Sequence, residues 1–309
     1  MKKPVEIPKI NPGEVRDLLA RYRITDGRKF RLKDHDPADT AGYSMDKPAA
    51  GMLLEAGVKR LAEFQDKLHA QDRWAMLCAF QAMDAAGKDG TIKHVMSGVN
   101  PQGVHVTAFK APGPEDLDHD FLWRIHRALP ERGRIGIFNR SHYEEVLVVR
   151  VHPEILERQK LPRELIGKKV WDQRLEAIAN YEKYLSQQGT VVLKFFLNVS
   201  KKEQKKRFME RLDNPEKNWK FSAGDLKERG HWDEYQKAYE AAIAATAAPH
   251  APWYVVPADN KWFTRLVVVA AINHALRKLD LQYPKVSDAQ RAELAVARVK
   301  LEAENGQPS

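Results

Sequence analysis

The sequence predicts an α/β protein whose sheet is parallel and covered by helices on both faces. Apolar segments with the length and boundaries of strands lie at 74–80, 104–109, 134–139, 190–199 and 253–257. Helical spacing appears between these segments, and parallel strands need crossover connections of that length. Strands buried on both faces read as nearly continuous apolar runs, as WAMLCAF at 74–80 does. Ligands of such a sheet are expected at the carboxyl ends of its strands.

The N-terminal part of the chain is expected to contribute an arm and one helix. Residues 1–50 are rich in Pro, Asp and Lys, show little periodicity, and predict an extended arm. The next apolar residues have the spacing of an amphipathic helix that precedes the first strand, and they are Leu54, Val58, Leu61 and Leu68.

Two helices are expected in the middle of the chain. The first begins at APGPEDL (111–117) and runs to about Leu129, where Pro130 ends it ahead of the strand at 134–139. The second is marked by helical spacing of Trp171, Leu175, Ile178 and Leu185.

The C-terminal half continues the alternation of strands and helices. TVVLKFFLNV at 190–199 is the strongest strand signal, because it is β-branched and aromatic almost throughout. Ser200 and Glu203 form a capping box that starts a basic helix after it. WYVVP at 253–257 predicts the last strand, and a helix follows through RLVVVAAI.

Composition limits the cellular setting and the class of partner. The formal net charge of +9 indicates an anionic partner, and nucleic acid, a membrane surface and a phosphate-rich substrate all stay open on charge alone. No apolar run approaches the roughly 20 residues that span a bilayer, and the N-terminus lacks the apolar segment of a secretory signal. The single cysteine, Cys78, excludes a disulfide framework and is expected to be buried. A cytoplasmic protein is therefore expected.

Basic residues gather directly after the strongest strand. They form a candidate anion-binding track, with a solvated helix face as the alternative, and they are Lys201, Lys202, Lys205, Lys206, Arg207, Arg211, Lys217 and Lys220.

The segment MDAAGKDGT at 83–91 predicts a phosphate-binding loop. It lies between a strand and a helix, the context in which backbone N–H groups and a helix N-terminus converge on phosphate. Lys88 stands where a P-loop lysine belongs, but Ala82 replaces the first glycine and Asp89 replaces the hydroxyl residue. Asp84 is unfavourable beside phosphate unless a metal or a proton lies between them. A chance GKDG turn is the alternative.

Polar residues also follow the third strand. Asn139 and Arg140 stand where P-loop enzymes carry a second metal-binding or phosphate-orienting group, and Glu144 comes one helical turn later. Since the carboxyl ends of parallel strands share one edge of the sheet, these residues are expected beside Asp84 and Lys88.

Four separated motifs in order resemble the polyphosphate kinase 2 family. They are MDAAGKDGT, HDFLWR (119–124), FNRSHYEEVLVVRVHP (138–153) and NPEKNWKFSAGDLKERGHWDEY (214–235), within a match from about residue 70 to residue 275. The chain is most similar to the single-domain third subgroup, which phosphorylates both AMP and ADP. The resemblance implies a P-loop kinase-like three-layer α/β/α sandwich with a parallel sheet and a helical lid.

The resemblance also implies an activity and a domain plan. The activity is transfer of a phosphoryl group from inorganic polyphosphate to AMP or ADP with Mg²⁺, reversibly from ATP to polyphosphate. The expected division is an arm and helix at 1–70, a phosphotransferase core at 71–285 and a C-terminal helix with tail at 286–309. A homo-oligomer is expected, with the helix at 287–304 packing on the core or bridging subunits.

Roles carried over from the family fall first on the phosphate loop. Ala86, Gly87, Lys88, Asp89, Gly90 and Thr91 would cradle the phosphate that is transferred. Asp84 would position the acceptor phosphate and help to hold Mg²⁺, because such transfer depends on alignment and charge neutralisation. Arg140 would clamp phosphoryl oxygens, a bidentate task suited to guanidinium. Arg124 is expected to bind polyphosphate as a second clamp, with an exposed helix arginine as the alternative.

One departure from the family affects the metal. Many relatives carry Asp where this chain has Asn139, so a neutral amide replaces a metal-binding carboxylate. Glu144 is the candidate substitute for the second Mg²⁺ ligand beside Asp84, with a surface glutamate as the alternative. Asn139, Arg140 and Glu144 are also expected on the nucleotide side of the site.

Residues 207–235 are expected to form a lid segment that closes over phosphates and excludes water. Ser222 with Asp225 predicts a second capping box inside it. Lys217, Lys220 and Arg229 would reach into the closed site and bind polyphosphate. The lid segment also holds aromatic residues that would stack on a base or pack in the core, namely Trp219, Phe221 and Trp232.

Two other functions stay open. An ATP-dependent nucleotide kinase would share the fold, but the missing hydroxyl after Lys88 and the long basic track argue against it. A basic nucleic-acid-binding NTPase would suit the charge, but the basic residues cluster beside the phosphate loop and not on an independent face. Neither nucleic acid nor a membrane is therefore expected as a partner.

Overall fold

A computed structural model describes residues 12–304 and contains one six-stranded sheet in the order β1-β6-β5-β2-β4-β3. All neighbouring strands are parallel except β1 and β6, which are antiparallel. The strands are β1 (Arg23–Ile24), β2 (Ala75–Ala82), β3 (Val104–Ala108), β4 (Ile135–Asn139), β5 (Thr190–Asn198) and β6 (Trp253–Pro257). The five parallel strands that the sequence predicts are thereby confirmed.

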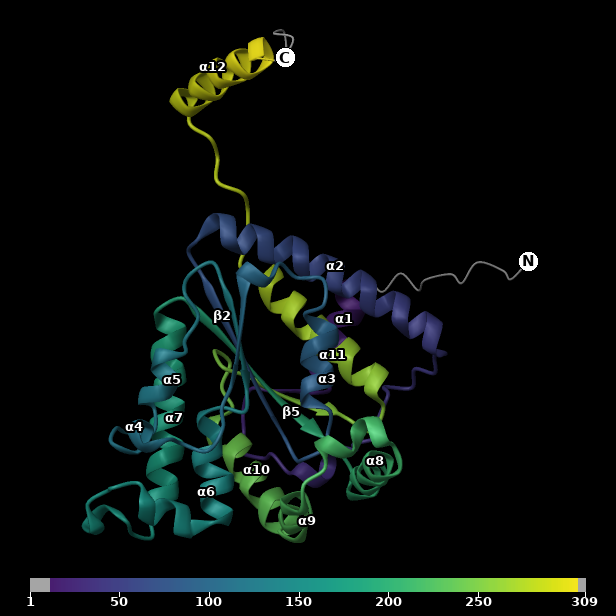
Figure 1. The fold of residues 1–309 in the computed structure, drawn as a ribbon, viewed down its shortest axis with the longest axis vertical. Helices are drawn as coiled ribbons and strands as arrows, with labels where there is room; N and C mark the ends of the chain where they lie inside the picture. Colours follow the sequence, from purple (N-terminus) through teal and green to yellow (C-terminus); the bar gives the residue numbers. More distant parts are fainter. Residues whose placement is uncertain (1–11, 305–309) are drawn as a thin grey trace.

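Helices cover the sheet in two layers (Figure 1). One layer holds α1 (Pro12–Ala20), α2 (Lys47–Gln71), α3 (Lys88–Val95) and α11 (Lys261–Arg277). The other holds α5 (Trp123–Arg127), α6 (Val148–Val151), α7 (Val170–Gln187) and α10 (Trp232–Thr246). The predicted α/β architecture with helices on both faces is therefore confirmed.

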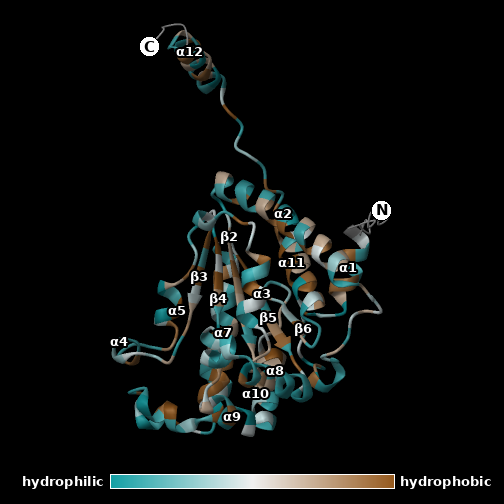
Figure 2. Cartoon of the chain, turned by 45° about the vertical axis from the view of Figure 1, so that its right-hand side comes forward, coloured by the Kyte–Doolittle hydropathy of each residue, from teal (hydrophilic) through white to brown (hydrophobic). Residues whose placement is uncertain are grey.

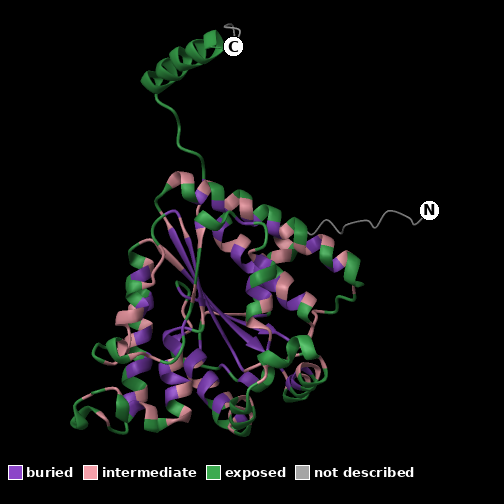
Figure 3. Ribbon diagram, viewed as in Figure 1, coloured by how far each residue is buried: buried purple, intermediate pink, exposed green. Residues whose placement is uncertain are grey.

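The central strand β2 shows why its sequence is apolar throughout. All of its residues are buried, and alternate side chains face opposite layers. Met76, Cys78 and Phe80 belong to the core under α11, while Leu77 and Ala79 belong to the core under α5 and α7. Figure 2 shows the apolar strands inside polar helices, and Figure 3 shows the same strands as the buried centre. A strand covered on both faces has no polar side to present.

Two predicted elements differ from the sequence expectation. The helix expected up to Leu129 is split into α4 (Pro114–Leu117) and α5, because the carboxylate of Asp120 accepts the Leu122 N–H and so competes with the helix. The extended arm is also wrong within the described residues, since α1 and β1 occupy part of 12–50. The Tyr22 carbonyl accepts the Val255 N–H, so this segment adds a sheet edge. Residues 1–11 lie outside the described residues.

A helical segment follows β5 at the carboxyl edge of the sheet. It comprises α8 (Lys201–Asp213), the 3₁₀ helix η6 (Pro215–Lys220) and α9 (Ala223–Gly230), and it leads into α10. The Ser200 hydroxyl accepts the Glu203 N–H at 3.0 Å, so the N-cap half of the first predicted capping box is present. The reciprocal half is wrong, because the Ser200 N–H donates to the Asp259 carboxylate and Glu203 pairs with Arg207. The second capping box is wrong, because Ser222 accepts from the Gly224 N–H and the Asp225 carboxylate pairs with Arg211 at 3.3 Å.

The remaining described elements are short, apart from the last helix. They are the 3₁₀ helices η1 (Leu32–Asp34), η2 (Pro101–Gly103), η3 (His142–Val146), η4 (Pro153–Arg158) and η5 (Arg163–Leu165), and the helix α12 (Asp288–Glu304). Between residues 12 and 304, no helix has the length and apolarity needed to cross a membrane.

Candidate active site

The loop between β2 and α3 has the geometry of a phosphate cradle. Gly87 caps α3 at φ 102°, in the left-handed region that glycine adopts without steric cost. The Thr91 N–H donates to the Gly87 carbonyl at 2.9 Å and closes the first helical turn. The N–H groups of Lys88, Asp89 and Gly90 precede that turn and therefore have no acceptor inside the helix. They converge where an anion is favoured, as the sequence predicts.

Helix α8 holds the back of this loop through two buried side chains. Gln204 donates from Nε2 to the Asp84 carbonyl at 3.0 Å. Arg207 donates from one guanidinium nitrogen to the carbonyls of Ala85 and Ala86, at 3.1 and 2.7 Å. Three successive carbonyl oxygens, which would repel phosphate, are therefore bound to α8. Ala85 has φ 59°, an unfavourable conformation for a residue with a Cβ that such contacts can maintain.

Arg207 also ties the loop to the opposite strand. Its other terminal nitrogen donates to the carbonyls of Ala258 and Asp259 after β6, at 2.6 and 3.2 Å. The Glu203 carboxylate accepts from Nε at 2.9 Å, so every donor group of this side chain is engaged. Arg207 is 4% exposed. The prediction that it belongs to an anion-binding track is wrong, because its donors are already used by the protein.

Four charged side chains meet beside the cradle. The guanidinium of Arg140 lies between two carboxylates, 3.5 Å from Asp84 and 4.0 Å from Glu144. Lys88 donates from Nζ to the Ala82 carbonyl at 3.3 Å. Arg140 follows β4 at φ 63°, and its N–H donates to the Phe80 carbonyl of β2 at 3.1 Å. The sequence expectation that the ends of β2 and β4 bring these residues together is confirmed.

Burial and mutual charge shift the proton equilibria of this group. Burial lowers the pKa of Lys88, and Arg140 lowers it further while the neighbouring carboxylates oppose the change. Burial raises the pKa of Glu144, and Arg140 and Lys88 oppose that shift. Burial also raises the pKa of Asp225 in α9, with a further contribution from the charge of Asp84. The lid segment therefore brings a carboxylate within electrostatic range of the cradle.

Asn139 and Asp89 form a direct bridge between the two strand ends. The Asn139 amide donates to the Asp89 carboxylate at 2.8 Å. Asp89 thus stands where a P-loop carries its hydroxyl residue, and one of its carboxylate oxygens already accepts this hydrogen bond. The amide that replaces a carboxylate at 139 can make this contact, whereas a carboxylate there would repel Asp89.

The carboxylate oxygens of the site are of the kind that bind Mg²⁺. Asp84 and Glu144 contact the same guanidinium, so both carboxylates lie beside Arg140. Within residues 12–304, no cluster of three or more His, Cys, Asp or Glu side chains could hold a metal alone. Mg²⁺ typically keeps several waters and takes one or two carboxylates together with substrate phosphates, which matches a two-carboxylate site.

The three basic lid residues that are predicted to bind polyphosphate differ in exposure and in their hydrogen-bond partners. Lys217 and Lys220 are exposed on η6. Arg229 donates to the Lys201 carbonyl at 2.9 Å and to the Gln204 side-chain oxygen at 2.6 Å, so it reaches the cradle through Gln204.

Arg124 lies in a network of protein groups. Its side chain is 12% exposed and donates to the Lys110 carbonyl at 2.8 Å. Carboxylate oxygens of Glu145 and Asp116 lie 3.7 and 3.9 Å from its guanidinium. Contact of Arg124, and of the three lid residues, with polyphosphate stays a prediction.

The aromatic residues of the lid segment divide by exposure. Trp219 is 78% exposed, whereas Trp232 is buried. The Phe221 ring packs edge-on against Phe208. Of the three residues, Trp219 presents the most free surface for stacking on a base.

Several residues near the charged group were not anticipated from the sequence. Gln81 is fully buried and donates to the Ser141 hydroxyl at 3.0 Å, and its side chain opposes the rise in the pKa of Glu144. A polar residue inside the otherwise apolar strand AMLCAFQA was the signal that could have identified it. Tyr239 of α10 is buried, and its pKa is raised by burial and by the charges of Glu144 and Asp84. Gln204 and Arg207 carry no sequence signal that separates them from their exposed neighbours in α8.

Comparisons with known proteins agree with the phosphate-binding geometry of the site. The family model described as Polyphosphate kinase 2 matches residues 45–284. The ADP-polyphosphate phosphotransferase of Rhodopseudomonas palustris is 49% identical over 282 residues, which cover 91% of this chain and 97% of that protein. The AMP/ADP-polyphosphate phosphotransferase of Meiothermus ruber is 45% identical over 271 residues, covering 88% and 97%.

A solved structure supports the same assignment. The crystal structure of polyphosphate kinase 2 from Arthrobacter aurescens superposes with a TM-score of 0.81 at 42% identity, and the match covers 94% of this chain and 98% of that one. The P-loop kinase-like fold class is thereby confirmed. From the cradle, the family match and these relatives together, the chain belongs to the polyphosphate kinase 2 family.

Proposed function

We propose that this protein transfers a phosphoryl group from inorganic polyphosphate to AMP or ADP, and from ATP to polyphosphate in reverse. The observation that carries the proposal is the cradle at the start of α3, with Lys88 beside the carboxylates and guanidinium of Asp84, Glu144 and Arg140. Relatives named for AMP and ADP as acceptors, with 45% and 49% identity, support the substrate class.

The reaction requires alignment of two phosphates more than covalent chemistry. An oxygen of the acceptor phosphate attacks the terminal phosphorus of polyphosphate, the bond from that phosphorus to the bridging oxygen breaks, and the shortened chain leaves with the electron pair. Lys88 and the N–H groups at the start of α3 would hold the phosphoryl group in transfer. Arg140 would bind its equatorial oxygens, and Asp84 would orient the acceptor.

Magnesium is part of the proposal. Asp84 and Glu144 would hold Mg²⁺, which would neutralise developing charge on phosphate oxygens. Gln81 would support this part of the site through its hydrogen bond to Ser141, the N-cap of the 3₁₀ helix η3 that contains Glu144. Asn139 would hold Asp89 away from the phosphates.

The lid segment would close the site against water. Lys217, Lys220 and Arg229 would add positive charge along the polyphosphate, and Arg124 would bind it from the other side. Binding would weaken with salt, because polyphosphate, like nucleic acid, releases counterions when cations replace them. We further propose a cytoplasmic location and a homo-oligomer.

The test is chromatographic analysis of nucleotides after the protein is mixed with Mg²⁺, polyphosphate and either AMP or ADP. Asp84→Asn and Lys88→Ala are expected to lose product formation at least about 10²-fold, the scale for loss of one preorganised charge contact. Lys93→Ala is the matched control, because Lys93 is exposed on the same helix.

Three other outcomes would indicate a different function or a different site. Product formed from ATP and AMP without polyphosphate would favour the ATP-dependent nucleotide kinase. Loss of all transfer with tight, salt-sensitive binding of RNA would favour the nucleic-acid-binding NTPase. Full activity in both cradle variants would contradict the placement of the site.

A further inference from the structure

Helices α1, α2 and α11 enclose an apolar groove that the proposed reaction does not use. None of the residues that line it belongs to the cradle or to the lid segment. Its volume of about 510 Å³ is typical of small-molecule sites, which measure about 300–1,000 Å³. The lining is apolar or aromatic except at Arg60, Asn273, His274 and Arg277. A groove of this composition favours an occupant with a mostly apolar body.

The walls of the groove are held together by a close approach of α2 and α11. The Asn273 side-chain amide donates to the Gly57 carbonyl at 2.9 Å. A Cβ at position 57 would lie 2.9 Å from a methyl group of Val269, so the absence of a side chain at Gly57 permits this approach. A preformed site loses less conformational freedom when a ligand binds. An occupant would therefore not require the walls to move apart.

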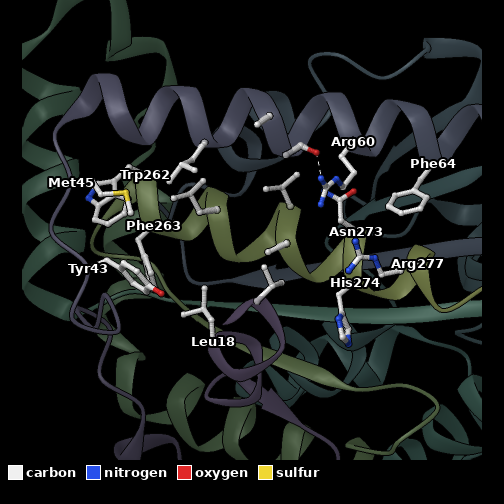
Figure 4. A pocket seen from close by; sticks show the side chains of 17 residues that line it. Leu18, Tyr43, Met45, Arg60, Phe64, Trp262, Phe263, Asn273, His274 and Arg277 are labelled. Carbon is white, nitrogen blue, oxygen red and sulfur yellow. Dashed lines mark hydrogen bonds between the residues drawn. The ribbon is translucent and has the colours of Figure 1, made fainter. Parts of the chain in front are cut away.

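The groove is elongated along α11. Trp262 and Arg277 line opposite ends of it, and this spacing corresponds to about 22 Å along the helix axis. Figure 4 shows Met45 and Trp262 at one end, and Arg60, Arg277 and His274 at the other. An unbranched chain suits a groove of this shape better than a compact molecule does.

One end of the groove is cationic, and its charge is not balanced within the lining. Arg60 and Arg277 are exposed there, and no aspartate or glutamate in the part of the chain that the structure describes lines the groove. Burial lowers the pKa of His274, and neighbouring lysine and arginine side chains, Lys278 first, lower it further. Residues 1–11, which precede α1, contain three lysines and one glutamate, so their charge does not complement this end. The positive end therefore favours a ligand with an anionic group.

We propose that the groove between α1, α2 and α11 binds a free, unbranched fatty acid as its carboxylate. The alkyl chain lies along α11 against the apolar lining, because each methylene that leaves water stabilises the complex. The carboxylate lies at the cationic end, where the guanidinium groups of Arg60 and Arg277 donate hydrogen bonds to it. The groove is apart from the cradle, so the inference stands or falls independently of the proposed reaction.

The first test is isothermal titration calorimetry of the full-length chain with octanoate, decanoate and dodecanoate, below their critical micelle concentrations. The dissociation constant is expected to fall about tenfold from each acid to the next, because two more methylenes are buried each time. Decylammonium, which has the same chain length as decanoate and the opposite charge, should bind at least about tenfold more weakly. Equal binding of these two ligands would contradict the carboxylate end.

Failure of all three acids to bind would overturn the inference. If that chain also sediments as a dimer at equilibrium, a second copy becomes the occupant of the groove. A dissociation constant that does not change with chain length would likewise overturn the inference, because the alkyl chain would then lie outside the groove.

A pair of charge variants tests the position of the carboxylate. Arg60→Gln/Arg277→Gln is expected to raise the dissociation constant of decanoate at least about tenfold, because both guanidinium partners are lost. The matched control is Lys59→Gln/Lys278→Gln, which changes the net charge equally at two adjacent exposed residues that do not line the groove. Equal effects of the two variants would show attraction by the net charge of the chain and would overturn the site.

A bulky side chain in the wall tests the position of the alkyl chain. Ala56 is exposed and lines the groove, so Ala56→Trp is expected to fill part of it and to weaken decanoate binding at least about tenfold. Ala62→Trp makes the same change on α2 outside the groove and should bind decanoate as the unmodified chain does. Thermal melting followed by circular dichroism checks that both variants fold. Unchanged binding by folded Ala56→Trp would place the ligand elsewhere.

Discussion

Arg207→Ala is expected to damage the phosphate cradle and the stability of the core together. The guanidinium donates to four carbonyls, two in the β2–α3 loop and two after β6, at 2.6 to 3.2 Å, and pairs with Glu203 at 2.9 Å. Removal leaves these buried acceptors without donors, and it leaves Glu203 with only the exposed Lys206 as a partner. Loss of one member of a buried ion pair costs about 3–5 kcal/mol in the free energy of unfolding.

The loss should be measurable as a lower Tm and a lower kcat/KM. At about 2 °C per kcal/mol for a chain of this size, the Tm is expected to fall by roughly 6–10 °C. The loop carbonyls of Ala85 and Ala86 lose the contacts that hold them, so the N–H groups that face phosphate shift. A displacement of about 1 Å in a positioning element can cost about 10²-fold in rate, and kcat/KM is expected to fall by that factor.

The assay pairs differential scanning calorimetry with initial rates of nucleotide phosphorylation. Lys206→Ala is the matched control, because Lys206 is the adjacent residue of α8, its side chain is 67% exposed, and it contacts the same Glu203 at 3.6 Å. Arg207→Lys should recover part of the Tm, since it keeps the charge without the planar fork. If Arg207→Ala keeps the Tm and rate of Lys206→Ala, Arg207 does not hold the cradle. If the variant loses only affinity for polyphosphate and the salt dependence of that affinity, Arg207 binds the substrate and not the loop.

Three further predictions address other parts of the molecule. Lys194 is fully buried and donates to Glu182 at 2.5 Å. Lys194→Met should therefore lower the free energy of unfolding, measured in urea, by about 3–5 kcal/mol, and Lys194→Met/Glu182→Leu should recover most of that loss. If the double variant recovers nothing, the ion pair is not the source of the loss. Burial lowers the pKa of His35 below its ordinary 6.5, so the folded state takes up a proton less readily than the unfolded one. Stability should be complete above pH 6.5 and fall below it, and a His35→Gln variant with an unchanged slope in denaturation at several pH values would contradict this. Chelation of Mg²⁺ with EDTA should lower the rate at least about 100-fold, reversibly on addition of excess Mg²⁺, whereas an undiminished rate would exclude the two-carboxylate metal site.

The parts of the fold that depend on local signals were predictable. WAMLCAF and TVVLKFFLNV each carry enough apolar and β-branched residues to specify buried strands, which appear as β2 and β5. The loop at 83–91 was predictable for a similar reason, because a left-handed N-cap at Gly87 and the helix after it are encoded within a few residues. The identity of Asp84, Lys88 and Arg140 as neighbours followed from the rule that parallel strands end at one edge.

Features that depend on contacts distant in sequence were not predictable. The edge strand β1 is two residues long and forms only because Tyr254 and Trp253 offer an open edge. Likewise, a helix expected up to Leu129 is interrupted by one carboxylate that accepts a single backbone N–H. Short elements gain little from their own residues, so tertiary or side-chain contacts decide them.

The parallel α/β core, the phosphate loop and the family resemblance could all be recognised from the sequence alone, because each depends on contiguous residues with a strong local preference. Which basic residues are exposed could be seen only after the chain had folded. Arg207 and Lys206 are adjacent in one lysine-rich helix, yet one is buried against backbone carbonyls and the other is exposed. The reason is that burial of a basic side chain depends on the groups that pack against it. For Arg207 these groups are the carbonyls of Ala85, Ala86 and Ala258, which follow two other strands.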